Sequence, residues 1–397
     1  MLMKLLYIVL DGAADLPIKQ LKNRTPLEVA EKPHLDELSA KSKLGKMNVI
    51  SKDIAPESDQ ATLALLGVDP FTCYTGRGPL EALGFGLKIK PHSIMLRCNF
   101  AFQKDDIIKL AKVAPSPGDI KEIEKQVNNI SKIKDIKITF KQTIGYRGIL
   151  ILTGKNLSPN ILGNHPGYKI INNFVTTATS KRENVPVTYC RALDKTKEAT
   201  KTVDILNDWL RHANSSLEHG NFSTNLILVR GAGNSLPKLS KLQGWAMMAD
   251  MPVEKAIGKL CGMTILPKPM DLQKLATSVK SAIKKHKAVY VQIKGTDNFS
   301  HDGNFIAKTR FIEELDSKFI KTIVHNLKNT IICITADHTT SSQTKTHTAD
   351  AVPVLLYVPG EDCDYLRFDE KLAEKGSLGK LTGIKLFKIL QNLMKFD

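Results

Sequence analysis

The sequence predicts an α/β protein whose main domain has a mostly parallel sheet with helices on both faces. It also predicts a second α+β domain inserted into the first. Three observations lead to this prediction: short apolar runs rich in β-branched residues recur, the segments between them have helical periodicity, and the middle of the chain changes in composition. Strands that alternate with helices and read as continuous apolar runs are typical of doubly wound parallel sheets.

The expected core strands lie near the beginning and the end of the chain. Four short apolar runs are each followed by small or polar residues, and they cover residues 5–10, 288–293, 331–335 and 352–358. Residues 308–327 repeat their apolar side chains at helical spacing. We therefore expect that segment to form one of the helices that cover the sheet.

The middle of the chain predicts a separate unit. From about residue 91 to residue 236 the sequence is richer in Lys, Asn and Thr, and its short alternating stretches indicate half-buried strands. Because the first core strand precedes this region and the others follow it, we expect a discontinuous core domain of residues 1–88 and 237–397. Residues 89–236 are expected to form the inserted domain.

The composition is that of a globular protein, with 42% hydrophobic and 24% charged residues among 397. We find no apolar run long enough for a transmembrane helix. The apolar start ends at Asp11 without a cleavage site, so we expect a buried strand rather than a signal peptide, and a cytoplasmic protein. Six cysteines without a CxxC pair indicate reduced thiols rather than disulfides or a thiolate zinc site.

The net charge is +17, from 57 Lys and Arg against 40 Asp and Glu. Such a surface suits nucleic acid, an anionic membrane or small anionic substrates. Aromatic residues are only 6% and no nucleic-acid module is recognisable, so we expect neither nucleic acid nor a membrane as a partner. A solvated lysine-rich surface and a small anionic substrate remain. The sequence identifies no symmetric interface and therefore leaves the oligomeric state unknown.

Carboxylates and imidazoles gather at the ends of the expected strands. A single aspartate there is often a turn or helix-cap residue, and a single histidine often lies on the surface, but several together indicate a site. Open α/β sheets bind ligands at the carboxyl edge of their strands, and this donor set suits Mn²⁺, Zn²⁺ or Fe²⁺. There are more candidate ligands than one tetrahedral ion needs, which favours a two-metal centre for phosphoryl chemistry. The candidates are Asp11, Asp297, His301, Asp337, His338 and His347.

Ser58 is the candidate nucleophile, because it stands just before an apolar helical run. A serine in this place is also an ordinary helix N-cap, so the position alone leaves both interpretations open. In the functional interpretation, the helix N-terminus and a metal ion lower the pKa of the hydroxyl and hold a phosphate.

Six segments occur in one order that resembles a known family. They are Leu10-Asp11-Gly12, residues 56–67 around Ser58, residues 74–84, Arg97-Cys98-Asn99-Phe100, residues 294–303 and residues 336–339. Together they resemble the archaeal type of 2,3-bisphosphoglycerate-independent phosphoglycerate mutase, in the alkaline phosphatase superfamily. The resemblance covers nearly the whole chain. It is strongest over residues 5–100 and 288–358 and weak over 101–225.

The resemblance implies an alkaline-phosphatase-like core that binds two divalent metal ions, and an inserted cap domain that binds the substrate. One ion would be held by Asp297, His301 and His347, and the other by Asp11, Asp337, His338 and the hydroxyl of Ser58. Mn²⁺ is the first candidate, and Mg²⁺, Zn²⁺ and Co²⁺ are alternatives.

The activity implied by the resemblance is the interconversion of 3-phosphoglycerate and 2-phosphoglycerate, in glycolysis and gluconeogenesis. Ser58 would take the phosphoryl group, and the bound glycerate would recover it on its other oxygen without bisphosphoglycerate. Basic side chains of the cap would hold this small anionic phosphorylated substrate, since guanidinium groups match carboxylate and phosphate. The candidates are Arg77, Arg97, Asn99, Arg147 and Arg230, and any one of these arginines could instead form a structural ion pair.

The sequence departs from the family pattern in several places. Glu57 stands where a glycine is usual, Thr62 where a histidine is common, and Ala349 where a glycine is usual. An arginine-rich segment of the family is replaced by residues 109–115, which carry two lysines. Other activities on the same framework therefore stay open: a homoserine-kinase-like phosphotransferase, a phosphomonoesterase, or a binding protein without catalysis.

Overall fold

The computed structural model describes residues 3–172, 175–179, 182–324 and 329–395. The chain divides into two compact units, and we call Met1–Cys73 with Lys238–Asp397 unit 1 and Tyr74–Pro237 unit 2. The inserted unit thus begins at residue 74, whereas the sequence suggested residue 89. We expected residues 74–88 in the core domain, but they belong to unit 2. The reason is that α5 (Arg77–Gly84) packs its apolar side chains against strands of unit 2.

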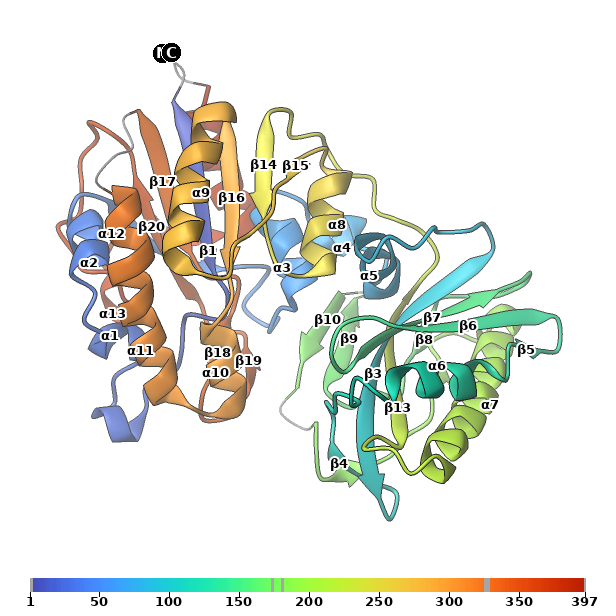
Figure 1. Cartoon of the computed structure of the whole chain (residues 1–397). Coiled ribbons are helices and arrows are strands. Elements are labelled where there is room, and N and C mark those ends of the chain that lie inside the picture. The colour runs from blue at the N-terminus through green and yellow to red at the C-terminus, as the bar shows by residue number, and fades with distance from the viewer. Residues whose placement is uncertain (1–2, 173–174, 180–181, 325–328, 396–397) are drawn as a thin grey trace. The chain divides into compact units, whose positions relative to one another are not determined.

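Unit 1 is built on one eight-stranded sheet (Figure 1). Its strands follow the order β15 (Thr264–Ile265), β14 (Trp245–Met248), β16 (Ala288–Ile293), β1 (Lys4–Leu10), β17 (Thr330–Thr335), β20 (Val352–Tyr357), β2 (Lys43–Asn48) and β21 (Gly379–Thr382). From β15 to β17 all neighbours are parallel, which confirms the mostly parallel sheet. The strands β16, β1 and β17 lie side by side, with β1 in the middle.

The fourth predicted strand is an exception to the parallel arrangement. β20 runs antiparallel to both of its neighbours, β17 and β2. A parallel return needs a crossover connection of a dozen or more residues, usually with a helix. The segment between β17 and β20 instead forms a hairpin of β18 (Thr339–Ser341) and β19 (Thr346–Thr348), so the chain comes back in the opposite direction.

Every residue of β16 and of β17 is buried, so helices must cover both faces of this part of the sheet. Figure 1 shows α9 lying across β16 and β1. The unit 1 helices are α1 (Pro26–Val29), α2 (Pro33–Ala40), α3 (Ser58–Leu65), α4 (Pro70–Cys73), α8 (Pro252–Leu260), α9 (Leu272–Lys285), α10 (Thr296–Asp302), α11 (Phe305–Leu315), α12 (Lys321–Val324), α13 (Glu370–Ala373) and α14 (Gly383–Leu393).

Local sequence signals explain where several helices begin. Asp271 caps α9 by accepting a hydrogen bond from the backbone N–H of Lys274, at 2.8 Å. Asn304 caps α11 in the same way. The helix predicted over residues 308–327 is present as α11, which continues through one π-helical turn into α12. Residues 325–327 of that prediction lie outside the described residues.

Unit 2 contains an antiparallel sheet. Its strands follow the order β11 (Val185–Pro186), β4 (Ile107–Leu110), β3 (Ser93–Lys104), β7 (Arg147–Thr153), β6 (Ile136–Gln142) and β5 (Lys132–Ile133), and β13 (Leu226–Gly233) pairs with β3. Two further pairs join β9 (Tyr168–Asn172) with β10 (Val175–Ala178), and β8 (Ile161–Leu162) with β12 (Arg191–Ala192). The alternating stretches that the sequence predicts in this region include residues 136–140 and 148–152, which fall on β6 and β7.

The two faces of the unit 2 sheet differ in what covers them. Alternate residues of β3, including Leu96, Cys98 and Phe100, pack into a large apolar core with α6 (Ile120–Asn128) and α7 (Lys197–His219). On the opposite face lie two small apolar clusters, one around Met95 with α5 and one around Leu228 with β4. Polar side chains occupy the band between these two clusters, as described below.

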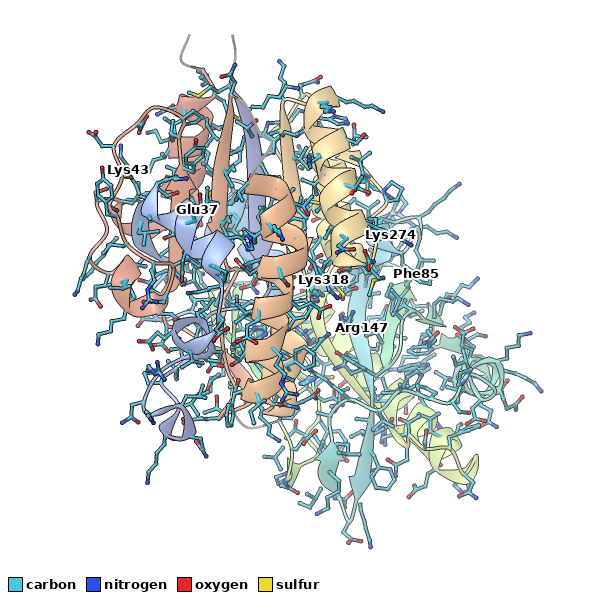
Figure 2. All side chains as sticks on the ribbon, turned by 60° about the vertical axis from the view of Figure 1, so that its left-hand side comes forward. Glu37, Lys43, Phe85, Arg147, Lys274 and Lys318 are labelled. Atoms are coloured by element: carbon cyan, nitrogen blue, oxygen red, sulfur yellow. The ribbon has the colours of Figure 1, made fainter. Side chains whose placement is uncertain are left out.

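Much of the lysine excess lies on the surface, where long side chains extend into solvent (Figure 2). A few of these lysines pair with carboxylates one helical turn away, such as Lys41 with Glu37 at 2.7 Å and Lys318 with Glu314 at 2.6 Å. Exposed pairs of this kind contribute little stability. Among the described residues, we find no helix with the length and apolar character needed to cross a membrane.

Candidate metal centre and substrate-binding cluster

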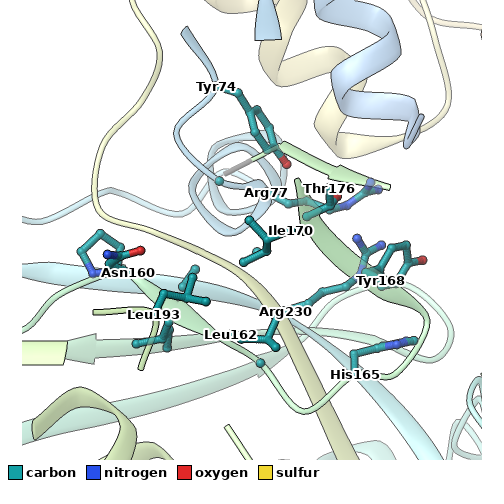
Figure 3. Close-up of a pocket in the computed structure, with 16 residues that line it drawn as sticks. Tyr74, Arg77, Asn160, Leu162, His165, Tyr168, Ile170, Thr176, Leu193 and Arg230 are labelled. Carbon is teal, nitrogen blue, oxygen red and sulfur yellow. The ribbon is translucent and has the colours of Figure 1, made fainter. Parts of the chain in front are cut away.

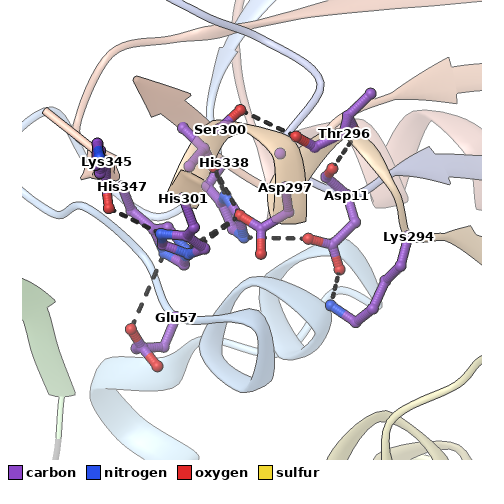
Figure 4. A network of polar contacts seen from close by, with 12 residues as sticks. Asp11, Glu57, Lys294, Thr296, Asp297, Ser300, His301, His338, Lys345 and His347 are labelled. Carbon is purple, nitrogen blue, oxygen red and sulfur yellow. Dashed lines mark hydrogen bonds and ion pairs between the residues drawn. The ribbon is translucent and has the colours of Figure 1, made fainter. Parts of the chain in front are cut away.

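The parallel strands of unit 1 place three aspartates at one edge of the sheet. Asp11 directly follows β1, Asp337 follows β17, and Asp297 lies in the first turn of α10, just after β16. Because these three strands are neighbours, their carboxyl ends meet (Figure 4). Gln292 of β16 joins two of the carboxylates, since its Nε2 donates to Oδ2 of Asp11 at 3.0 Å and to Oδ2 of Asp337 at 2.9 Å.

The turn after Asp11 requires a glycine. Gly12 has a φ of +61°, and a Cβ there would lie 2.6 Å from Oγ1 of Thr340 and 2.9 Å from Oδ1 of Asp297. Its backbone N–H donates to Oδ1 of Asp337 at 3.0 Å. The turn thus brings the backbone close to two of the candidate ligands, which explains the Asp-Gly pair that follows the first strand.

Two sets of donor atoms lie close enough to hold metal ions. In each set the donor atoms lie within 4.8 Å of one another; the sets are Asp297, His338 and His347, and Asp11, Asp337 and His338. His301 stands beside the first set, with its Nε2 3.5 Å from Oδ1 of Asp297. Asp297 and His301 are four residues apart on α10, so their side chains lie on the same face of one helix.

The histidines are oriented as metal ligands usually are. Nδ1 of His301 lies 2.8 Å from the carbonyl oxygen of Lys345, and Nδ1 of His347 lies 2.7 Å from that of Pro56. A carbonyl only accepts hydrogen bonds, so each Nδ1 carries the proton and the neutral ring keeps a lone pair on Nε2. Nε2 of His347 and of His301 each lie 3.5 Å from Oδ1 of Asp297, an arrangement that a cation would stabilise.

The buried carboxylates of Asp11 and Asp337 also favour the binding of a cation. Burial and the neighbouring charge of Asp11 raise the pKa of Asp337 well above its ordinary value. Oδ1 of Asp11 and Nε2 of His338 are buried, lie 3.7 Å apart, and have no hydrogen-bond partner among the described residues. Unsatisfied buried polar atoms are costly, and a bound cation would partner both of these atoms and add to the positive charge of Lys294, which pairs with Asp11. The residues present therefore fit a divalent metal ion.

Ser58 is the first residue of α3 rather than its cap. The N-cap is Glu57, whose side chain makes no capping hydrogen bond. The contact of Pro56 with His347 holds this segment beside the histidines, and Oε1 of Glu57 lies 4.0 Å from Nδ1 of His347 (Figure 4). Thr62 donates to the carbonyl oxygen of Ser58 at 2.6 Å. The interpretation of Ser58 as an ordinary N-cap is thus not supported by the geometry.

Lys294 and Glu254 belong to the same site, although the sequence analysis did not single them out. The ammonium of Lys294 pairs with Oδ2 of Asp11 and lies 3.9 Å from Oε1 of Glu254. Glu254 comes from α8, and burial is the main cause that raises its pKa to about 8. Lys294 stands three residues before Asp297 and could have been noticed, whereas nothing near Glu254 in the sequence indicates a site.

The substrate-binding candidates of unit 2 share the polar band of its sheet. Arg230 of β13 lies directly opposite Arg97 of β3, and Asn99 of β3 lies opposite Arg147 of β7. Residues two apart on a strand face the same side, so these four side chains lie on one face. The fifth candidate, Arg77, comes from α5, which covers that face.

One carboxylate that the sequence analysis missed holds this cluster together. Oε1 of Glu81 accepts hydrogen bonds from Nε of Arg77 at 2.9 Å and from Nη1 of Arg97. Burial acts to raise the pKa of Glu81, but the charges of Arg97, Arg77 and Arg147 outweigh it and lower that pKa to about 2. The charges that act most strongly on Arg97 are those of Glu81, which is negative, and of three guanidiniums.

A pocket opens beside this cluster (Figure 3). Arg77 and Arg230 line it, and the guanidinium of Arg230 lies 3.8 Å from the ring centre of Tyr168. His165 also lines the pocket, with its Nε2 3.3 Å from Nδ2 of Asn99. These aromatic residues lie in the part of the sequence where the resemblance is weak, so no motif pointed to them.

Comparison with known proteins gives the family. The family profile described as 2,3-bisphosphoglycerate-independent phosphoglycerate mutase matches residues 39–222, and that of the metalloenzyme superfamily matches residues 238–393. The mutase of this name from Methanopyrus kandleri is 33% identical, over 98% of this chain and 96% of the relative. That from Methanococcus aeolicus is 34% identical, over 98% of both.

Solved structures agree with the fold. The cofactor-independent phosphoglycerate mutase of Thermoplasma acidophilum superposes with a TM-score of 0.62 and 26% identity, over 99% of this chain and 100% of that one. A protein from Pyrococcus horikoshii superposes with a TM-score of 0.76 over the whole of both chains, at 24% identity. From the full-length similarity, this chain belongs to the 2,3-bisphosphoglycerate-independent phosphoglycerate mutase family, whose members are isomerases that depend on divalent metal ions.

Proposed function

We propose that this protein interconverts 3-phosphoglycerate and 2-phosphoglycerate through a phosphoserine at Ser58. The observation that carries the proposal is the gathering of the aspartate and histidine candidates at one sheet edge, in a chain similar to such mutases over its whole length. Unit 1 carries the transfer chemistry, and unit 2 recognises the anionic substrate.

Two divalent ions complete the centre in this proposal. Asp297, His301 and His347 hold one, and Asp11, Asp337, His338 and Ser58 hold the other. Mn²⁺ is the first candidate because the donors mix carboxylate oxygens with imidazole nitrogens, with Mg²⁺, Zn²⁺ and Co²⁺ as alternatives. Bound divalent ions lower the pKa of a hydroxyl and offset the charge of phosphoryl oxygens.

The protein residues have distinct tasks in the transfer. The Ser58 oxygen loses its proton and bonds to phosphorus as the bond between phosphorus and O3 of the glycerate breaks, and O3 takes up a proton. In the second step O2 loses its proton and bonds to phosphorus, the bond to the Ser58 oxygen breaks, and the serine regains its proton. The position of Ser58 in the first turn of α3 places its phosphoryl group at the positive end of the helix dipole. Pro56 and Glu57 keep this segment beside His347.

The charge of the unit 2 cluster suits the substrate. Phosphoglycerate carries one carboxylate and one phosphate, a total charge of about −3 at neutral pH. Arg77, Arg97, Arg147 and Arg230 bring four positive charges, and Glu81 removes one. Because these groups are partly desolvated, the remaining positive charge favours an anion of this kind over a neutral ligand.

The six free cysteines support a reducing compartment, which would be the cytoplasm. Cys98, Cys190, Cys261 and Cys333 are buried.

The test is to incubate the purified protein with 3-phosphoglycerate and Mn²⁺ and to follow the products by phosphorus NMR. We expect 2-phosphoglycerate, no requirement for ATP, and no product from the Ser58→Ala variant. Release of free phosphate alone would identify a phosphomonoesterase instead. Phosphorylation of homoserine that depends on ATP would identify the kinase alternative.

A further inference from the structure

Tyr146 is a tyrosine beside the arginine cluster to which no role has yet been given. It lies in the turn between β6 and β7, just before Arg147. Nη2 of Arg147 donates to its hydroxyl at 3.4 Å, and the guanidinium lies 5.2 Å from its ring centre. The ammonium of Lys112 lies 5.8 Å from the same ring centre.

The backbone of β3 explains why these groups meet. The N–H of Phe100 donates to the carbonyl oxygen of Tyr146 at 2.7 Å, and its own carbonyl accepts from the N–H of Val113 at 2.9 Å. Phe100 therefore fixes Tyr146 and the segment that carries Lys112 beside one another. That segment is the lysine-containing stretch that replaces the arginine-rich segment of the family, so one of its cations lies at the cluster.

The charges that act most strongly on the Tyr146 hydroxyl are positive, and they are those of Lys112 after β4, Arg147 of β7 and Arg97 of β3. A carboxylate also lies on the Lys112 segment, where the N–H of Ala111 donates to Glu183 at 3.0 Å. The carboxylate of the cluster, Glu81, contacts Arg77 and Arg97. Burial acts to raise the pKa of Tyr146, but these three cations outweigh it and lower that pKa to about 7.

The Tyr146 hydroxyl can also act as a hydrogen-bond donor. Because its oxygen accepts from Arg147, its own O–H points elsewhere and can donate to a second acceptor. An anionic oxygen attracted by Arg147, Arg97 and Lys112 would be such an acceptor. A hydrogen bond from a hydroxyl to an anionic oxygen is among the stronger kinds found in proteins.

We propose that the Tyr146 hydroxyl is a further substrate-binding group, which donates to an anionic oxygen of the substrate when protonated and opposes its binding when ionised. This inference rests on the proposed function, since it adds a residue to the site for phosphoglycerate. At low pH the phenol strengthens binding. At high pH the phenolate has given its proton to solvent and competes with the substrate for the same three cations.

The experiment measures binding rather than turnover, in the full-length Ser58→Ala protein with metal, so that the ligand is not converted during titration. The affinity for 3-phosphoglycerate is measured by calorimetry with and without Tyr146→Phe. At about pH 6 we expect Tyr146→Phe to weaken binding about tenfold. At about pH 8.5 the loss should vanish or reverse, because phenylalanine carries no negative charge.

Two further variants make the result specific. Tyr189→Phe is the matched control, since Tyr189 lies in the same unit and is 71% exposed, and it should change nothing. Lys112→Met keeps an apolar stem but removes one cation, so it should move the pH at which the effect of Tyr146→Phe disappears to a higher value. The absorbance of tyrosinate, compared between wild type and Tyr146→Phe, should show one tyrosine ionising near neutral pH.

The outcomes separate the inference from the proposed function. An equal loss of affinity at both pH values would mean that Tyr146 only packs against Arg147, and no loss at either would mean that it does not touch the substrate. Either result would overturn the inference while leaving the mutase proposal intact. A folded wild-type protein that neither binds nor converts 3-phosphoglycerate would overturn both.

Discussion

At the scale of single residues, Asp297 is the carboxylate that faces two histidines of the candidate metal centre. Its carboxylate faces His301 and His347, and it accepts a hydrogen bond from Thr340 at 3.0 Å. Burial acts to raise its pKa, but in the absence of a metal ion the protonated forms of His301 and His347 hold that pKa well below the ordinary value. Removing the charge of Asp297 should therefore weaken metal binding and leave the protein folded.

We predict that Asp297→Asn weakens metal binding by more than about tenfold and abolishes mutase turnover. The helix α10 should persist, because asparagine is nearly isosteric with aspartate. Competition with a chromophoric chelator measures the affinity, and circular dichroism follows the fold. Asp302→Asn is the control, since Asp302 ends the same helix and is exposed. Full activity of Asp297→Asn after chelation would contradict the metal assignment.

At the scale of elements, the turn after β1 couples backbone geometry to the metal site. We predict that Gly12→Ala lowers the free energy of unfolding by about 1–2 kcal/mol through its positive φ alone. It should also weaken metal binding, because the new Cβ crowds Asp297. Chemical denaturation and chelator competition measure the two effects.

Gly360→Ala separates these causes. Gly360 also has a positive φ, +82°, but a Cβ there would meet nothing within 4 Å. Gly360→Ala should lower the free energy of unfolding through its positive φ, as Gly12→Ala does, and should leave the metal affinity unchanged. Equal metal affinities in the two variants would show that the close approach at Gly12 does not position the ligands.

The pairing of α5 with the unit 2 sheet gives a pH-dependent prediction. The pKa of Glu81 falls from an ordinary value of 4.5 to about 2 on folding. Its carboxylate therefore stabilises the fold fully above pH 4.5, and this contribution is lost as the pH falls toward 2. We predict that Glu81→Gln removes about 3 kcal/mol at neutral pH and flattens the acid side of the stability curve.

Denaturant unfolding at several pH values checks this expectation. Glu122→Gln is the matched control, because Glu122 lies in the same unit on α6 with half of its side chain exposed. That variant should follow the wild-type curve. If Glu81→Gln kept the full acid dependence of the wild type, the stabilising pair would have to be sought elsewhere.

At the scale of the whole molecule, a mutase must keep the dephosphorylated glycerate while it turns, or water would make the enzyme a phosphatase. We predict that Arg230→Ala slows isomerisation far more than hydrolysis of a simple phosphomonoester. The ratio of phosphate released to 2-phosphoglycerate formed should rise, because the carboxylate is held less firmly. Phosphorus NMR measures both products.

Arg211→Ala is the control for this prediction, since Arg211 forms an exposed ion pair with Asp208 on α7 of the same unit. An equal loss of both activities in Arg230→Ala would mean that this arginine supports the fold or the transfer chemistry instead. Arg97 is less suitable for the test, because its removal would leave the buried Glu81 with one partner fewer.

The sequence by itself determined the strands, their aspartates and the family. Residues 5–10, 288–293 and 331–335 are short apolar runs that end in Asp-containing turns, and such local patterns survive in the folded chain as β1, β16 and β17. The order of the motifs identified the family, and full-length relatives confirm it. The separation of four residues between Asp297 and His301 is also read from the sequence, and the structure has both on α10.

Only the tertiary structure decided which distant side chains meet. β20 runs antiparallel and α5 packs in unit 2 because of contacts between residues far apart in sequence. The local sequence patterns of β20 and α5 therefore could not predict either feature. The same holds for Glu81 among the arginines and for Tyr146 between Lys112 and Arg147. A buried charge or hydroxyl acquires its properties from its spatial neighbours, and the register of three antiparallel strands assembles those neighbours.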